Sequence, residues 1–143
     1  MELSCKTEYA LLALLELTDQ YQQRPLQIRQ IAAKQNISDR YLEQLLATLR
    51  RGGLVKSQRG AKGGYLLARN PRRITLLDVI SCLEGSESTG SQDGNVATVE
   101  KNVVQEVWRE VYQSALEVLQ NYTLQDLSDK RKAQSQSDFM YYI

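Results

Sequence analysis

The sequence contains no histidine and only two cysteines among its 143 residues. Without histidine the chain lacks the commonest general base, the Ser-His and Cys-His catalytic pairs, and every zinc site that needs imidazole. Cys5 and Cys82 lie far apart and form no C-x-x-C motif, so no zinc ribbon or thioredoxin-type redox pair is indicated and reduced thiols are expected. No nucleophile, base and orienting group converge, and we predict neither an enzyme nor a metal site.

Long apolar segments are also missing. No run of 18 apolar residues occurs, and the N-terminal stretch MELSCKTEYALLALLEL has no basic region before its apolar part and contains Glu2, Glu8 and Glu16. A membrane span and a secretory signal are therefore not expected, and we predict a cytoplasmic protein with no membrane partner. The length fits one domain that buries a core without disulfide or metal staples.

The net charge of +1 conceals two halves of opposite sign. Residues 1–75 contain 13 Lys and Arg against 6 Asp and Glu, a balance of +7, whereas residues 76–143 contain 5 against 11, a balance of −6. A basic half followed by an acidic half indicates that the first part meets a polyanion and that the second serves another purpose.

Three helices are predicted in the basic half. Apolar residues recur at three- and four-residue spacing in 6–17, in IRQIAAKQ (28–35) and in DRYLEQLLATLRR (39–51), as on one buried helical face. Asn36 suits the left-handed conformation that ends the second helix, and Ser38 is a suitable N-cap for the third. Two helices joined by about three residues are typical of a helix-turn-helix.

A basic hairpin is predicted directly after the third helix. The short β-like runs LVKSQ and YLLAR flank RGAKGG, whose three glycines permit a tight tip and whose Arg59 and Lys62 make that tip positive. A phosphate-binding loop is not indicated, since no G-K-[ST] follows and a strand replaces the helix that would receive the phosphate. A helix-turn-helix followed by a basic hairpin is a winged helix.

The rest of the chain is predicted to be an arm. Thr75 and Asp78 form a capping box for a short helix that ends at Gly85, and the polar segment 86–95 is expected to be a flexible loop. One long helix is predicted over 96–122 and a short one up to residue 132, which Thr123 and Asp126 cap. We predict a mostly α fold with a small β-hairpin: a winged helix-turn-helix DNA-binding domain (1–85), the loop, a dimerisation arm (96–132) and a tail (133–143).

Candidate DNA contacts gather on the third helix and the hairpin. Gln, Glu and Arg side chains near the N-terminus of such a helix can pair with base edges in the major groove, whereas cations near its end and on the wing suit phosphates and the minor groove. The base-reading candidates are Asp39, Arg40, Tyr41, Glu43, Gln44 and Arg59, and the phosphate candidates are Thr48, Arg50, Arg51, Lys56 and Lys62. The alternative is that these polar residues only cover a solvated surface, but the flanking turn and wing favour DNA binding.

The long helix carries a wide apolar stripe. It suits a core helix, a coiled-coil arm or a two-fold dimer contact, and its excess length favours dimerisation. The predicted dimer contacts are Val103, Val107, Trp108, Val111, Ala115 and Leu119. A two-fold dimer reads two half-sites about one helical turn apart, so a partly palindromic double-stranded DNA operator is expected.

Three blocks of the sequence, LSCKTEYALLALLEL, IAAKQNISDRYLEQLLATLRRGGLVKSQRGAKGGYLLAR and ITLLDVISCLEG, resemble the Rrf-two family of winged-helix transcription regulators. The resemblance covers residues 1–85 closely and implies the fold, the dimer and DNA binding. It also implies that Tyr41, Glu43 and Gln44 face bases and that Arg59 enters the minor groove. Asp39 and Arg40 differ from the small residues typical of the family, so the operator need not be shared.

The resemblance fails at the sensor site. Cluster-binding members place three closely spaced cysteines in the loop before the long helix, where this chain reads SESTGSQDGNVATVEKN. Since thiolates hold iron-sulfur clusters, we expect no such cofactor, and Glu8, which matches a carboxylate ligand of some members, has nothing to complete. Cys5 and Cys82 are interpreted as buried small residues, with a thiol switch as the alternative.

The sequence therefore predicts a homodimeric, sequence-specific DNA-binding transcription regulator, acting as a repressor and lacking an iron-sulfur cluster. In an alternative from another class, the acidic arm docks onto a metabolic enzyme as a protein partner and DNA binding is secondary.

Overall fold

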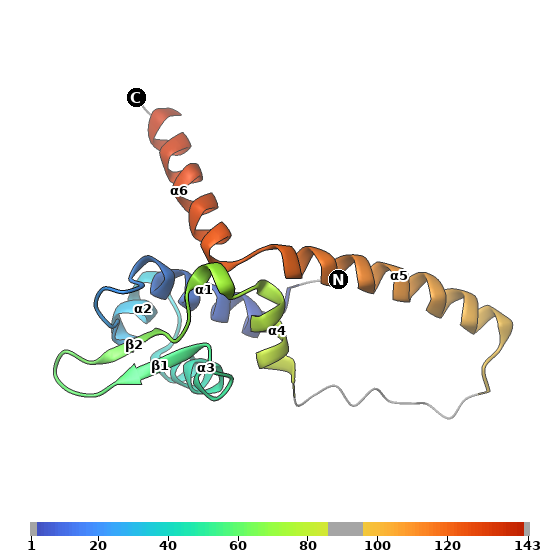
Figure 1. Ribbon diagram of the computed structural model, residues 1–143, viewed down its shortest axis with the longest axis horizontal. Helices are drawn as coiled ribbons and strands as arrows, with labels where there is room; N and C mark the ends of the chain where they lie inside the picture. The colour runs from blue at the N-terminus through green and yellow to red at the C-terminus, as the bar shows by residue number, and fades with distance from the viewer. Residues whose placement is uncertain (1–2, 86–95, 142–143) are drawn as a thin grey trace.

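The computed structural model describes residues 3–85 and 96–141, and the loop predicted at 86–95 lies outside these residues. The elements in chain order are α1 (Cys5–Asp19), α2 (Ile28–Gln35), α3 (Asp39–Arg51), β1 (Val55–Gln58), β2 (Gly64–Leu67), the 3-10 turn η1 (Pro71–Arg73), α4 (Leu76–Glu84), α5 (Val99–Asn121) and α6 (Leu124–Tyr141) (Figure 1). The predicted mostly α fold with one small hairpin is confirmed.

The core lies between α1, α3, α4 and the hairpin. The four leucines of α3 that the spacing predicted to be internal are buried: Leu42, Leu45, Leu46 and Leu49. The internal face of α1 consists of Ala10, Ala13, Leu14 and Leu17, at the three- and four-residue spacing of a single arc. Leu11 and Leu15, which were also expected on that face, fall outside this arc and are only partly buried. Burial of each internal leucine contributes about 1.5–3 kcal/mol.

Local capping sets the angle between α2 and α3. Asn36 ends α2 in the left-handed conformation (φ 55°), and the Ser38 hydroxyl accepts a hydrogen bond of 3.2 Å from the backbone N–H of Tyr41. The capping boxes predicted at Thr75 with Asp78 and at Thr123 with Asp126 are both formed. The predicted helix-turn-helix is therefore confirmed, because each of these signals acts within a few residues of itself.

The hairpin joins a third segment of the chain. Strands β1 and β2 pair antiparallel from Val55 with Leu67 to Gln58 with Gly64, and Tyr65 exchanges backbone hydrogen bonds of 2.7 and 2.9 Å with Leu26. Gly64 has a φ of 153°, and a Cβ there would collide with the carbonyl oxygen of Leu26. This glycine is therefore needed for the close approach of the α1–α2 connection, in addition to the freedom of the tip.

The arm differs from its prediction at both ends. Thr98 caps α5, so the long helix begins at Val99 instead of residue 96, and it ends at Asn121. Helix α6 continues to Tyr141, well beyond residue 132, where the short helix was expected to end and a tail to begin. The segment Leu124–Tyr141 contains neither Gly nor Pro, and without either residue nothing interrupts the helix at 133.

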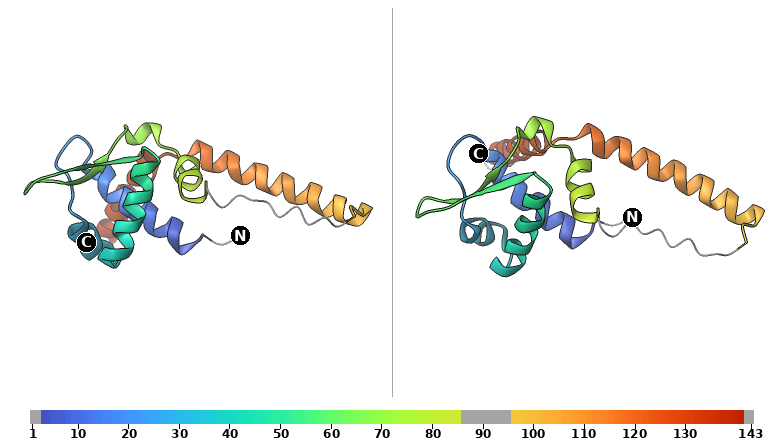
Figure 2. Two further views of the ribbon diagram at one scale, coloured as in Figure 1. Left: turned by 90° about the horizontal axis from the view of Figure 1, so that it is seen from below. Right: turned by 60° about the horizontal axis from the view of Figure 1, so that its bottom comes forward.

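Helix α5 projects away from the body, on the side opposite to the hairpin, in all three views (Figures 1 and 2). Helix α6 turns back and packs on α1, with Leu124 and Ser128 buried at the contact. No described helix combines the length and the apolar character that crossing a membrane requires.

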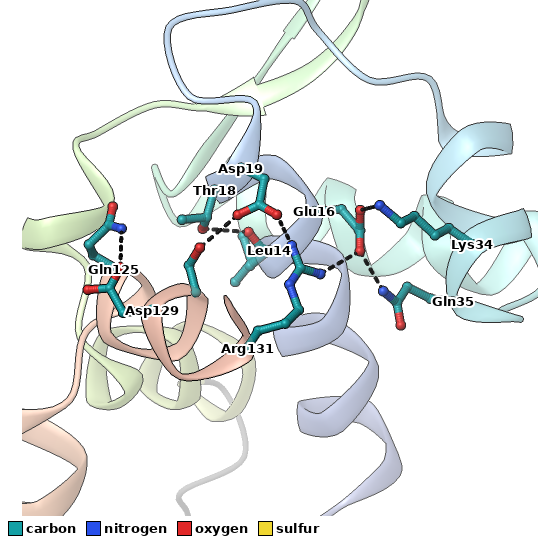
Figure 3. Close-up of polar contacts among 10 residues, drawn as sticks. Leu14, Glu16, Thr18, Asp19, Lys34, Gln35, Gln125, Asp129 and Arg131 are labelled. Atoms are coloured by element: carbon teal, nitrogen blue, oxygen red, sulfur yellow. Dashed lines mark hydrogen bonds and ion pairs between the residues drawn. The ribbon is translucent and has the colours of Figure 1, made fainter. Parts of the chain in front are cut away.

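A buried carboxylate ties three helices together (Figure 3). Glu16 of α1 is 4% exposed; its Oε2 lies 2.9 Å from Lys34 Nζ of α2, and its Oε1 lies 2.8 Å from Arg131 Nη1 of α6. Gln35 donates a further hydrogen bond of 2.6 Å to Oε1, and Arg131 also pairs with Asp19. Burial raises the pKa of Glu16, but the hydrogen bonds from Lys34, Arg131 and Gln35 lower it by more, so this pKa lies below its ordinary value.

Replacing Glu16 by Gln is expected to lower the free energy of unfolding at pH 7 by about 1–3 kcal/mol, because the charge-assisted hydrogen bonds become neutral ones. A carboxyl group whose folded pKa is depressed stabilises the fold fully above its unfolded pKa of about 4.3 and loses that effect as the pH falls through the folded value. The gap between wild type and Glu16→Gln should therefore shrink below about pH 4.

Urea unfolding at pH 7 and at acid pH measures this gap. Asp129→Asn is the matched control, since that carboxylate is exposed and accepts only a 3.0 Å hydrogen bond from Gln125. The control should change stability by less than about 0.5 kcal/mol. A gap that stayed constant down to acid pH would contradict the ionised Glu16.

Candidate nucleic-acid interface

The predicted base-reading residues of α3 lie on its solvent side, with one exception. Asp39, Arg40, Glu43 and Gln44 are exposed, and the leucines on the opposite side hold the helix to the core. Their spacing gathers them on one face over the first two turns. A helix that presents polar side chains in this way has the geometry required to reach base edges in a major groove.

Tyr41 is the exception. It is half-buried, and its ring meets the ring of Tyr9 edge to face, with the centroids 5.7 Å apart. An edge-to-face pair of this kind contributes about 0.5–1.5 kcal/mol beyond the area that it buries. Tyr41 therefore packs α3 against α1 in addition to any contact that it makes with DNA.

The end of α3 is connected to the hairpin through side chains. Arg50 donates a hydrogen bond of 3.3 Å to the Ser57 hydroxyl of β1, while Arg51 donates one of 3.2 Å to the Thr48 hydroxyl. Thr48 is half-buried, and its own hydroxyl donates to the carbonyl oxygen of Gln44 at 3.1 Å. The three phosphate candidates on α3 are thus held in place by their neighbours, and two of them, Arg50 and Arg51, are exposed.

The wing carries the remaining cations. Lys56 on β1 and Arg59 and Lys62 at the tip are all exposed. Together with Arg40, Arg50 and Arg51 they outnumber the two carboxylates on this face, Asp39 and Glu43. An exposed cationic surface that continues from a helix onto a hairpin suits the phosphate backbone of a nucleic acid.

Sequence reasoning missed a cleft beside the wing. It lies between the α1–α2 connection and the hairpin, and its lining includes Arg24, Gln27, Gln58 and Lys62. Arg24 adds a cation next to the predicted Lys62. Only the Leu26 to Tyr65 pairing brings these segments together, and no short-range signal in the sequence indicates that pairing.

The predicted dimer stripe on α5 is largely solvent-exposed in the single chain. Val103 and Val107 are 55% exposed, Trp108 is 66% exposed and Val111 is 40% exposed, while Ala115 and Leu119 are half-buried. No residue of α5 is buried. A row of large apolar side chains exposed in this way is typical of a surface that packs against another protein.

The two thiols are less buried than the sequence interpretation held. Cys5 is exposed, because it is the first residue of α1, and Cys82 is half-buried, with its Sγ 3.5 Å from the carbonyl oxygen of Thr48 on α3. Burial raises the pKa of the Cys82 thiol, and the nearby charge of Arg51 offsets only part of this. Cys82 is therefore less ionised at neutral pH than an ordinary thiol.

These features define the class of protein first: an exposed, basic recognition helix after a tight turn, followed by a hairpin wing, is a winged helix-turn-helix DNA-binding protein. Residues 3–130 match the Rrf2 family, described as iron-dependent transcriptional regulators. The HTH-type transcriptional regulator CymR of Bacillus subtilis (strain 168) is 38% identical over 143 residues, with 100% of both chains covered. The chain belongs to the Rrf2 family of transcriptional regulators.

Two further relatives agree in fold. The solved structure of T. potens IscR has 41% sequence identity and a TM-score of 0.78, with 94% of this chain and 91% of that chain covered. The structure of B. subtilis CymR (YrzC), the global cysteine regulator, has 38% identity and a TM-score of 0.78, covering 91% and 98%. The protein is thus a DNA-binding transcription regulator and not an enzyme, as predicted from the sequence.

The donor atoms of this chain do not fit the iron-sulfur cluster that some members of such a family bind. Cys5 and Cys82 are its only cysteines, and it has no histidine. Within residues 3–85 and 96–141, no three His, Cys, Asp or Glu side chains are grouped so that they could hold a metal ion. Clusters are commonly held by four thiolates, and two isolated thiols on different helices do not supply that set.

Proposed function

We propose that the protein is a homodimeric repressor that binds a partly palindromic operator and carries no iron-sulfur cluster. One observation carries this proposal: the same chain has an exposed cationic surface over α3 and the wing and an exposed apolar stripe on α5. The first surface suits DNA and the second suits a second copy of the chain. Two-fold pairing through α5 would present two recognition helices to half-sites about one helical turn apart.

The roles proposed for individual residues follow from their places. Asp39, Arg40, Tyr41, Glu43 and Gln44 read bases in the major groove, and Arg59 enters the minor groove. Thr48, Arg50, Arg51, Lys56 and Lys62 contact phosphates. The exposure of nearly all of these side chains supports the assignment, and only Tyr41 and Thr48 are half-buried.

Enrichment of a random-sequence DNA pool by the purified protein tests DNA binding and requires no assumption about the operator sequence. A partly palindromic duplex, called the enriched duplex below, should bind at least about a thousandfold more tightly than bulk competitor at 0.1 M salt. Failure to enrich any duplex would contradict the proposal.

The cluster-free state is tested on protein purified without oxygen. A colourless sample free of iron is expected, and a brown, iron-loaded sample would overturn this part of the proposal. Repression is tested by transcription in vitro from a promoter that contains the enriched duplex. Added protein should lower the transcript yield, whereas a raised yield would identify an activator.

The alternative in which the acidic arm docks onto a metabolic enzyme keeps one supporting feature, the exposed Glu106, Glu110 and Glu117 of α5. Purification from cell extract separates the two functions. A stoichiometric enzyme retained on wild-type protein that enriches no duplex would favour the alternative.

A further inference from the structure

Every ion pair between α6 and the N-terminal half of the described chain passes through Arg131. The described pairs are Lys34 with Glu16, Arg69 with Asp78, and Arg131 with both Glu16 and Asp19. Glu16 is also the one buried charged side chain among the residues described. The cluster of Glu16, Asp19, Lys34, Gln35 and Arg131 thus joins α6, which follows the long helix, to α2, the first helix of the helix-turn-helix (Figure 3).

The face of α6 that makes this contact is continuous. Leu124 and Ser128 are buried, and Arg131 follows one turn later on the same side of the helix. Ser128 donates a hydrogen bond of 2.7 Å to Asp19 Oδ1, on the carboxylate that also receives Arg131. The apolar contact therefore fixes where α6 lies, and the polar contacts fix how it is turned relative to α1.

Glu16 divides its two oxygens between the helices. Oε2 faces Lys34 of α2, whereas Oε1 accepts from Arg131 of α6 and from Gln35 of α2. A carboxylate removed from water depends on its cations, because its attraction to them replaces the hydration that it has given up. If α6 shifts, Arg131 withdraws and the whole burden falls on Lys34 and Gln35 at the end of α2, one residue before the turn that leads to α3.

We propose that Glu16 is a positioning residue: through Arg131 and Lys34 it transmits the placement of α6 to α2 and so sets the affinity of α3 for DNA. The inference rests on the DNA-binding surface proposed above. It gives the C-terminal helix a part in DNA binding although none of its residues belongs to the recognition helix or the wing.

The test measures binding of the enriched duplex, at a temperature where circular dichroism shows every variant folded. Arg131→Met should weaken binding about tenfold, while its dependence on salt concentration should keep the wild-type slope. A cation that contacts phosphate directly would instead lower that slope by about one when it is removed. Lys132→Met is the matched control, because it removes the same charge from the next, exposed position of α6 and should bind as wild type does.

A double-mutant cycle shows whether the effect passes through Glu16. In the Glu16→Gln background, Arg131→Met should change the dissociation constant less than twofold, because the neutral amide no longer depends on the guanidinium. Arg131→Lys, which restores a cation, should recover part of the affinity.

Three outcomes would overturn the inference while leaving the proposed function intact: wild-type affinity in folded Arg131→Met, a lowered salt slope in that variant, or an equal loss from Arg131→Met in both backgrounds. If the wild-type protein enriches no duplex, the proposed function fails first. Reduced thermal stability with wild-type affinity would identify the cluster as purely structural and also overturn the inference.

Discussion

Val107→Asp combined with Val111→Asp is expected to convert the protein to a monomer and to weaken binding of the enriched duplex at least about a hundredfold. Both valines lie on the exposed stripe of α5, at four-residue spacing, so they share one face of the helix. In a two-fold dimer the pair of substitutions places four carboxylates in the interface. An unpaired charge removed from water costs several kcal/mol, which exceeds what the contact can tolerate.

Sedimentation equilibrium gives the oligomeric state, and titration of the enriched duplex gives the affinity. The matched control is Gln105→Asp with Gln113→Asp, which adds the same charge to exposed polar positions of α5 outside the predicted contacts. The control should remain a dimer with nearly wild-type affinity. Equal losses in both variants would show that negative charge on the arm weakens DNA binding without any role for the stripe, and a dimeric valine variant would place the interface elsewhere.

The parts of the fold that the sequence could predict are those governed by neighbours in the chain. The leucines of α3 fall at helical spacing, Ser38 caps the helix that it precedes, and Asn36 adopts the left-handed conformation at the end of α2. Each of these signals acts within about one turn of helix, so periodicity and capping rules read it directly. The candidate recognition surface could be predicted for the same reason, because exposure on α3 is the complement of its buried face.

Contacts between distant segments could not be predicted in this way. Glu16 interrupts an apolar stretch of α1, and its spacing gives no reason to place it among buried residues. Its burial depends on Lys34 and on Arg131, which is 115 positions away, and only the tertiary fold brings the three together. The same holds for the link from Arg50 to Ser57 across the end of α3 and the first strand.

The arm shows a third kind of limit. Apolar periodicity identified α5, but the stripe on α5 that suits a partner has the same pattern as one that suits the chain's own core. Exposure of Val107 and Trp108 in the single chain separates these two interpretations. The length of α6 escaped because polar residues after 132 carry no periodic apolar signal, although nothing in them interrupts a helix.

Arg59→Ala is expected to weaken binding of the enriched duplex at least about thirtyfold, since removal of one base contact costs about 1–3 kcal/mol and the substitution removes two from a dimer. Arg59 is exposed next to Gly60, whose φ of 110° turns the chain at the tip of the wing. An arginine at such a tip can enter a narrow minor groove, where the negative potential is strongest. Discrimination should therefore fall at the base pairs flanking each half-site, in addition to the overall affinity.

Titrations with duplexes altered at those flanking pairs measure this discrimination. Lys62→Ala, at the same tip, should weaken all duplexes alike and reduce the salt slope by about one for each phosphate that is no longer neutralised, because a phosphate contact carries no sequence information. Arg72→Ala removes an equal charge from the exposed turn after the hairpin and should leave binding nearly unchanged. If Arg59→Ala bound every duplex as the wild type does, the wing would have no part in recognition, and base reading would rest on α3 alone.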